Sequence, residues 1–239
     1  MTKRLNKQVE KGRVTKEDVD GLVSRMESST NMEDLKKADI IIEAATENLA
    51  LKTTIFEKID SIAKPGAILA TNTSSISITK IASATKRPES VVGMHFMNPV
   101  PVMKGVELIR GLKTSDETYE ETKALAEAMG KTTTLAKDMP GFIANRILMP
   151  YINEACFALQ EGIGSCEDID VTMKLGTGVP MGPLTLADLI GLDTCLSILQ
   201  VLHTEFGDSK YRPSPILVKH VEAGWLGKKT GRGFYDYSK

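Results

Sequence analysis

Short apolar runs rich in β-branched residues alternate with amphipathic segments in the first part of the chain. Residues 38–45, 67–71 and 91–95 form three such runs. Between the first two, residues 52–63 carry apolar side chains at helical spacing, and Ser77 begins a shorter helical segment between the second and third. Because strands that are covered on both faces read as continuous apolar runs, this pattern predicts parallel strands joined by crossover helices.

Strand candidates continue at residues 106–109 and 132–135, on either side of a helical segment over 116–129 that Gly130 ends. Beyond residue 138 the strand-like runs stop. Helical spacing then continues in 142–159, 184–191 and 193–206, with a further helix opening at Ser214 and Pro215. We therefore predict an α/β domain over residues 1–138 and an all-helical domain over residues 139–239.

Composition narrows the class of protein. Of the 239 residues, 41% are hydrophobic and 26% charged, and the formal net charge is −1, which excludes a disordered chain and argues against nucleic acid as a partner. The apolar runs are too short to span a bilayer and the chain opens in charged residues, so we expect a cytoplasmic protein with no membrane partner. Cys156, Cys166 and Cys195 show no CxxC spacing, which argues against a disulfide framework and a zinc site.

The opening segment is rich in basic residues. Between residues 3 and 16 there are six lysines and arginines, and Glu10 is the one acidic residue. The segment is either a solvated helix face or a patch for an anionic substrate, and its composition leaves both open. Gly12 followed by Thr15 and Asp18 predicts that one helix ends there and a second begins with a capping box.

Polar residues gather where the three predicted parallel strands end, at 46–48, 72–75 and 95–101, which is where open parallel sheets bind ligands. His95 is the strongest candidate for chemistry, because an imidazole can take up and return a proton near neutral pH. Glu107 lies in an apolar run that could return from the turn after His95, and paired with it would fix the imidazole tautomer. The alternatives are a merely hydrogen-bonded histidine at a strand end and a glutamate that points to solvent.

Two motifs of nucleotide-binding proteins are missing from these 239 residues. No window fits GxGxxG, since Gly176 and Gly178 are followed by Gly182 one residue out of register, and no Walker A motif occurs. His203 and His220 lie in helical segments and are interpreted as structural or surface residues.

Three longer motifs are specific when taken together: NTSSI at 72–76, MHFMNPVPVMK at 94–104 and PGFIANR at 140–146. With them, the sequence from about residue 5 to residue 239 resembles the 3-hydroxyacyl-CoA dehydrogenase family, and especially its short 3-hydroxybutyryl-CoA dehydrogenases. The resemblance implies that the protein interconverts (S)-3-hydroxyacyl-CoA and 3-oxoacyl-CoA with NAD as cofactor. The expected hydroxyacyl substrate is 3-hydroxybutyryl-CoA. It also implies a Rossmann-type dinucleotide-binding domain and a helical domain that forms a homodimer or higher oligomer.

The resemblance assigns roles residue by residue. His95 matches the general base, Glu107 the acid paired with it, and Ser74 and Asn145 the residues that hydrogen-bond the reacting end of the substrate. Positions that contact NAD match Glu47, Lys52, Ser74, Asn98 and Lys229. The basic residues 3–11 fall where the family meets the phosphates of coenzyme A, and no metal is implied.

The sequence departs from the family pattern at its start. The first strand, the glycine-rich turn, its helix and the second strand, about fifty residues, have no counterpart here, so we expect an incomplete Rossmann-type sheet with unpaired, apolar surface. The alternative function is a non-catalytic remnant that dimerises and binds acyl-CoA weakly. A related dehydrogenase of free hydroxy acids is disfavoured, because such enzymes typically use lysine where this pattern has His95 and Glu107.

Overall fold

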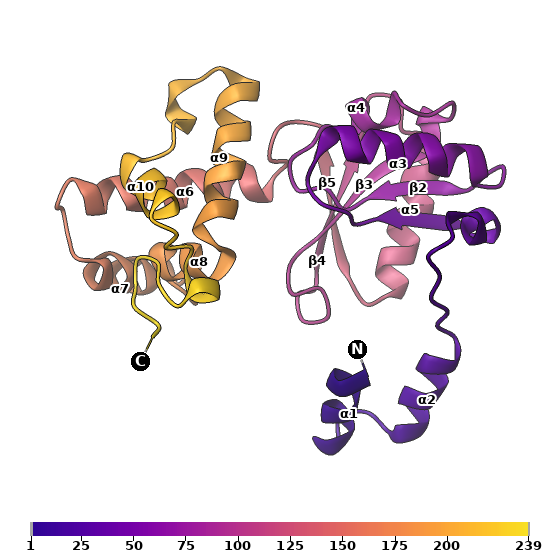
Figure 1. Ribbon diagram of the computed structural model, residues 1–239, viewed down its shortest axis with the longest axis horizontal. Coiled ribbons are helices and arrows are strands. Elements are labelled where there is room, and N and C mark those ends of the chain that lie inside the picture. The colour runs from indigo at the N-terminus through magenta and orange to yellow at the C-terminus, as the bar shows by residue number, and fades with distance from the viewer. Residues whose placement is uncertain (1, 239) are drawn as a thin grey trace.

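The computed structural model describes residues 2–238 and shows two domains side by side, with a helical hairpin at the N-terminus standing apart from both (Figure 1). One domain is built around a five-stranded sheet. Its strands lie in the order β1 (Ile40–Glu43), β2 (Ile68–Thr71), β3 (Val91–Phe96), β4 (Gly105–Arg110) and β5 (Thr132–Lys137). The predicted strands are therefore confirmed, with bounds that shift by one or two residues.

Strand direction differs from a fully parallel sheet at one pairing. β1, β2 and β3 run parallel, β4 runs antiparallel to β3, and β5 runs parallel to β4. Residues 97–104 connect β3 to β4, and so short a loop cannot make the crossover of about a dozen residues that parallel neighbours require. The return brings the start of β4 to the same edge of the sheet as the end of β3.

Helices cover both faces of the sheet, as the continuous apolar runs predict. Three helices belong to this domain: α3 (Leu49–Ile62), α4 (Ile78–Ala82) and α5 (Asp116–Ala128). Leu69 and Val91 pack with α3 and α4 on one face, while their neighbours Ala70 and Val92 pack with α5 on the other. β1 is an edge strand of this sheet, and Ile42 on it is exposed.

The N-terminal hairpin consists of α1 (Thr2–Glu10) and α2 (Lys16–Ser24), which pack against each other. Gly12 between them has a positive φ, and Thr15 and Asp18 form the predicted capping box at the start of α2. Figure 1 shows the hairpin extending away from the sheet.

The second domain is all-helical, as predicted. It contains α6 (Ala144–Gln160), α7 (Cys166–Thr177), α8 (Pro183–Ile190), α9 (Leu192–Phe206) and α10 (Pro215–Glu222). Ile152, Leu184 and Leu199 are among the residues at the centre of its core. Short 3₁₀ turns complete the fold: η1 (Met32–Lys37), η2 (Pro88–Ser90), η3 (Ser209–Tyr211) and η4 (Lys228–Thr230).

Helix α6 begins two residues later than the apolar pattern predicts. Phe142, expected inside the helix, has a φ of 49° and follows Gly141 with a φ of 77°, so the chain makes a left-handed turn before the helix can start. None of the helices between residues 2 and 238 is by itself long and apolar enough to cross a membrane; α8 and α9, bent by 98°, would meet the length and composition test only as a pair.

Candidate functional site

Antiparallel pairing of β3 with β4 sets His95 directly opposite Glu107. His95 Nδ1 lies 2.9 Å from Glu107 Oε2. Both residues are buried, with 7% of His95 and 3% of Glu107 exposed, and β4 lies between two strands, so the interpretation that Glu107 points to solvent from an edge is wrong. His95 also sits beside the ring of Phe142, at 6.0 Å between centroids.

The second oxygen of Glu107 is held by the helical domain. Oε1 accepts hydrogen bonds from the backbone N–H groups of Ile143, at 2.9 Å, and Ala144, at 3.0 Å. Burial raises the pKa of Glu107, but the hydrogen bonds from His95 and these two N–H groups lower it, and the pKa ends below its ordinary value. Glu107 is therefore ionised at neutral pH and accepts the proton of Nδ1, which leaves the lone pair of the imidazole on Nε2.

Asn145 follows on the first turn of α6 and links that helix to the loop after β2. Its Nδ2 donates to the backbone oxygen of Ser74 over 3.1 Å, and the side chain is buried. The Ser74 hydroxyl makes no hydrogen bond to any residue between 2 and 238, and Ser74 is half-buried. The second N–H of Asn145 and this hydroxyl are thus able to reach a ligand.

Glu47 shapes the same loop from the side of β1. Its Oε1 accepts from the backbone N–H groups of Ser74 and Ser75, at 2.9 and 3.0 Å, and from the hydroxyls of Thr73 and Ser75. One carboxylate oxygen thereby fixes the backbone of the loop, while Oε2 stays 3.7 Å from Lys52 Nζ.

Lys52 occupies a different environment from the one its predicted role suggests. Its side chain is only 1% exposed, and Nζ binds both oxygens of Glu43, at 2.8 and 2.9 Å, and the backbone oxygen of Ala45. Glu43 also accepts from the Thr71 hydroxyl at 2.7 Å. Lys52 thus stabilises the ends of β1 and β2 through Glu43. Sequence reasoning missed Glu43 as a site residue. The available signal was an acidic residue inside an otherwise apolar strand.

A cleft of about 400 Å³ opens where β1 and β2 end, between the two domains. Ala45, Glu47, Asn72, Ser74 and Ser75 line it from the α/β domain, and Asp193, Thr194, Ser197 and Ile198 line it from α9. This mixture of carboxylate, amide and hydroxyl groups fits the ribose and carboxamide of a nicotinamide cofactor, which need both donors and acceptors. Of the residues predicted to contact NAD, Glu47 and Ser74 lie on this cleft.

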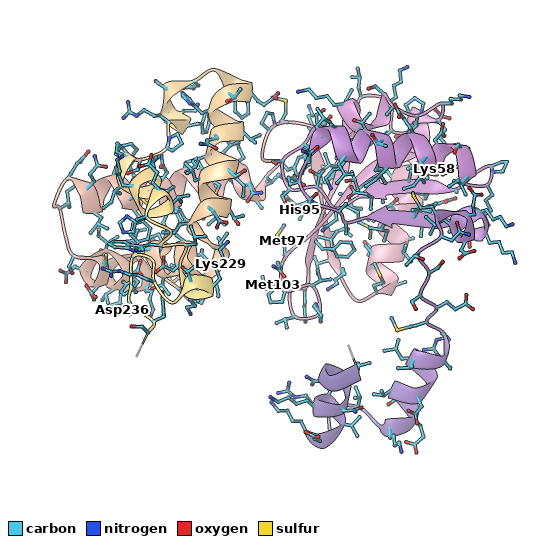
Figure 2. The ribbon with its side chains drawn as sticks, viewed as in Figure 1. Lys58, His95, Met97, Met103, Lys229 and Asp236 are labelled. Atoms are coloured by element: carbon cyan, nitrogen blue, oxygen red, sulfur yellow. The ribbon has the colours of Figure 1, made fainter. Side chains whose placement is uncertain are left out.

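Asn98 and Lys229 are not among the residues that line the cleft. Asn98 is exposed just beyond β3. Lys229 Nζ pairs with both carboxylate oxygens of Asp193, at 2.5 and 2.7 Å. Figure 2 shows Lys229 on the side of the helical domain that faces the α/β domain, opposite His95. Burial raises the pKa of Asp193, whereas the hydrogen bond from Lys229 lowers it, and the net pKa is below the ordinary value, so an ion pair sits at the cleft.

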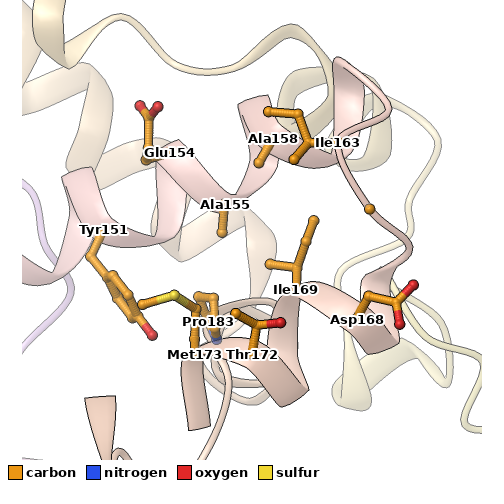
Figure 3. A pocket seen from close by; sticks show the side chains of 11 residues that line it. Tyr151, Glu154, Ala155, Ala158, Ile163, Asp168, Ile169, Thr172, Met173 and Pro183 are labelled. Carbon is orange, nitrogen blue, oxygen red and sulfur yellow. The ribbon is translucent and has the colours of Figure 1, made fainter. Parts of the chain in front are cut away.

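The basic residues of the N-terminal hairpin are not brought to this cleft. Lys7, Lys11 and Arg13 are exposed on a hairpin that lies away from both domains, and the side chains of Lys3 and Arg4 fall outside the described residues. A second cavity, of about 310 Å³, lies wholly in the helical domain between α6, α7 and the start of α8, and is lined largely by apolar side chains (Figure 3). It contains none of the predicted site residues.

Comparison with known proteins gives matches over nearly the whole chain. The family model described as the NAD-binding domain of 3-hydroxyacyl-CoA dehydrogenase matches residues 1–139, and the one for the C-terminal domain of the same enzyme matches residues 141–237.

Individual relatives agree with the family models. A 3-hydroxybutyryl-CoA dehydrogenase of Bradyrhizobium diazoefficiens is 55% identical over 233 residues, which are 98% of this chain and 80% of that protein. The human mitochondrial hydroxyacyl-coenzyme A dehydrogenase is 44% identical over 92% of this chain and 71% of its own. The crystal structure of an (S)-3-hydroxybutyryl-CoA dehydrogenase from Ralstonia eutropha superposes with a TM-score of 0.96 at 52% identity, covering all of this chain and 84% of that one.

Proposed function

The chain belongs to the 3-hydroxyacyl-CoA dehydrogenase family of NAD-dependent oxidoreductases, and from that premise we propose that it interconverts (S)-3-hydroxybutyryl-CoA and acetoacetyl-CoA with His95 as general base. The observation that carries the proposal is the buried contact between His95 Nδ1 and an ionised Glu107. The buried carboxylate of Glu107 gains a hydrogen-bond partner in His95, and this hydrogen bond fixes the tautomer of the imidazole.

The proton of the 3-hydroxyl is taken by Nε2 of His95. Because Glu107 accepts the hydrogen bond from Nδ1, Nε2 carries the lone pair, and it has no hydrogen-bond partner among residues 2–238. The imidazolium that forms is stabilised by Glu107, which stays ionised and therefore supplies a full counter-charge. In the direction of reduction, the same nitrogen returns the proton to the oxygen at C3.

Ser74 and Asn145 orient the oxygen at C3. The free N–H of Asn145 and the hydroxyl of Ser74 come from the two domains, and the hydrogen bond between Asn145 and the Ser74 backbone holds them together. Donors aimed at this oxygen polarise the carbonyl of a 3-oxoacyl-CoA and steady the negative charge that develops on it. NAD, when bound in the cleft beside Glu47 and Ser74, supplies the hydride chemistry at C3.

The basic residues of the N-terminal hairpin support the proposal that the substrate is a coenzyme A thioester. Lys7, Lys11 and Arg13 present exposed cations without a compensating cluster of acids on α1, and cations of this kind attract phosphates. The four-carbon acyl group is proposed because the relatives from Bradyrhizobium and Ralstonia are 3-hydroxybutyryl-CoA dehydrogenases. The alternative of a non-catalytic remnant gains no support, since the chain aligns with named dehydrogenases along its full length.

The helical domain is the proposed site of self-association. Several apolar side chains of this domain are exposed: Ile147 on α6, Ile163 after it, Val171 and Leu175 on α7 and Leu189 on α8. Ile147, Tyr151 and Ala158 follow helical spacing on one side of α6, and Tyr151 and Ala158 line the apolar cavity of Figure 3. A second copy of the chain would cover this surface in a symmetric dimer.

The direct test is an assay with acetoacetyl-CoA and NADH, following the loss of NADH absorbance. We expect turnover that depends on the thioester, with acetoacetate as the control that lacks coenzyme A. Turnover of free acetoacetate at the same rate, or no NADH oxidation with either compound, would contradict the proposal.

A further inference from the structure

Glu107 is held by groups from two domains, and this division has a chemical consequence. Oε2 faces His95 on β3, whereas Oε1 faces the N–H groups of Ile143 and Ala144 at the start of α6. The pair that is proposed to move the proton therefore lies in the α/β domain, but two of the three hydrogen bonds to its carboxylate come from the helical domain.

The turn before α6 determines where those N–H groups point. Phe142 adopts a φ of 49°, a conformation that non-glycine residues rarely occupy, and its ring is buried beside His95. Gly141 has a φ of 77°, and a Cβ there would come within 2.8 Å of Leu202 Cδ2. The turn is also fixed upstream, because the carboxylate of Asp138 accepts from the N–H groups of Ile78 and Thr79 and from the Ser77 hydroxyl.

We propose that Phe142 is a positioning residue whose left-handed backbone aims the N–H groups of Ile143 and Ala144 at Glu107, so that the helical domain sets the orientation and charge of the His95–Glu107 pair. The inference rests on the proposed function for its catalytic meaning. It concerns a device that holds the pair, since neither Phe142 nor the two N–H groups touches the reacting atoms.

Few charged groups surround Glu107, so the effect of the two N–H groups on the His95–Glu107 pair can be measured. β3 contributes His95, β5 contributes the uncharged Thr134 in register, and α6 contributes the two N–H groups. Arg146, one turn along α6, stacks on the rings of Phe206 and Tyr211 instead. His95 is thus the one titratable group that contacts Glu107 within residues 2–238.

The N–H groups favour the state in which the pair carries a net negative charge, namely neutral imidazole beside carboxylate. Removing one of them destabilises that state relative to the protonated pair. The pair should then take up its proton at higher pH. Because Glu107 stays ionised in both states, the shift reflects only the difference in the strength of this hydrogen bond between them.

The experiment replaces the amide at Ala144 with an ester by incorporating lactic acid, which deletes the N–H and keeps the side chain. The matched control is an ester at Asp116, the first residue of α5. Each ester weakens one comparable carbonyl acceptor, because Ile143 O accepts from Ile147 at 3.3 Å and Ser115 O accepts from Tyr119 at 3.2 Å. A second pair of variants changes the turn itself. Phe142→Gly keeps the left-handed conformation accessible, whereas the β-branched side chain of Phe142→Val disfavours it.

The readout is the pH titration of the imidazole ¹⁵N signals by NMR, in protein without cofactor or substrate, assigned with His95→Gln. We expect the midpoint of His95 to lie higher in the Ala144 ester than in the wild type, and higher in Phe142→Val than in Phe142→Gly. His203 and His220 should not move, and neither should His95 in the Asp116 ester. Because Phe142→Gly and Phe142→Val both remove the ring beside His95, the effect of the backbone turn is the difference between these two variants. An Ala144 ester that titrates like the Asp116 ester would overturn the inference. Because this measurement needs no turnover, it separates failure of the inference from failure of the proposed function.

Discussion

At the scale of single residues, the site depends on which atom of His95 is free. The contact of Nδ1 with Glu107 Oε2 leaves Nε2 for the proposed proton transfer, and in the same proposal Ser74 and Asn145 bind the substrate. His95→Gln removes the base without removing those donors. We expect kcat to fall by about 10²–10⁴-fold with KM nearly unchanged, because general-base catalysis contributes on that scale. Steady-state kinetics with acetoacetyl-CoA measures both, and an unchanged kcat would exclude His95 as the base.

Glu107→Gln tests the charge of the partner. Glutamine keeps the hydrogen-bonding shape but carries no negative charge, so the imidazolium loses its counter-ion. We expect kcat to fall by roughly 10²-fold and the acidic limb of the pH profile for alcohol oxidation to move to lower pH. This direction is opposite to that expected for the Ala144 ester, since one change removes the negative charge and the other removes groups that stabilise it. A profile that superposes on the wild type would show that the two side chains do not act together.

At the scale of elements, the carboxyl ends of β1 and β2 are held by a buried ion pair. Lys52 from α3 reaches Glu43 on β1, and Glu43 also binds Thr71 on β2. Lys52→Met leaves the carboxylate buried without its cation, and we expect a loss of about 3–5 kcal/mol in the free energy of unfolding. The double variant Lys52→Met with Glu43→Gln should recover part of that loss. Urea denaturation followed by circular dichroism measures both, and a single variant as stable as the wild type would contradict the account.

The elements also show what the sequence can and cannot predict. The five strands, both domains' fold classes and the capping box at Thr15 follow from local patterns, because apolar period and capping chemistry are local properties. The left-handed Phe142 does not follow, since its ring packs beside His95 on β3, and the preceding Gly141 lies against Leu202 on α9, and both partners are distant in sequence. The Glu43–Lys52 pair is likewise non-local, and only the anomalous acid within an apolar strand indicated it.

The site residues divide in the same way. The turn after His95 allowed a return strand that could bring Glu107 close, and the register of β3 with β4 places them opposite each other. The N–H groups on Glu107 Oε1 come from the helical domain, and Asp193 lies in the same domain as its partner Lys229 but far from it in sequence, so no local pattern predicts either contact. The roles of Ser74, Asn145, Glu47, Lys52, Asn98 and Lys229 came from the family resemblance and stay predictions that mutagenesis must test.

At the scale of the whole molecule, the two domains meet around the chemistry. Asn145 binds the Ser74 backbone, Ile143 and Ala144 bind Glu107, and Lys80 on α4 pairs with Glu205 on α9 at 3.0 Å. The cleft lies between the same surfaces. Most of these contacts come from the first turn of α6, so a movement of the helical domain that displaced this turn would disturb the base and the substrate donors together.

The proposed self-association concerns the exposed apolar residues of the helical domain. Leu175 on α7 is 83% exposed, and covering it together with its apolar neighbours would remove that surface from water. Leu175→Lys places a charge where two copies would meet, and we expect it to shift a dimer toward monomer. Leu112→Lys is the matched control, because Leu112 is 85% exposed but lies in the α/β domain after β4. Sedimentation velocity over a range of concentrations compares the two variants with the wild type. A lower mass confined to Leu175→Lys would locate the contact between copies on α7. Equal masses for both variants and the wild type would place that contact elsewhere.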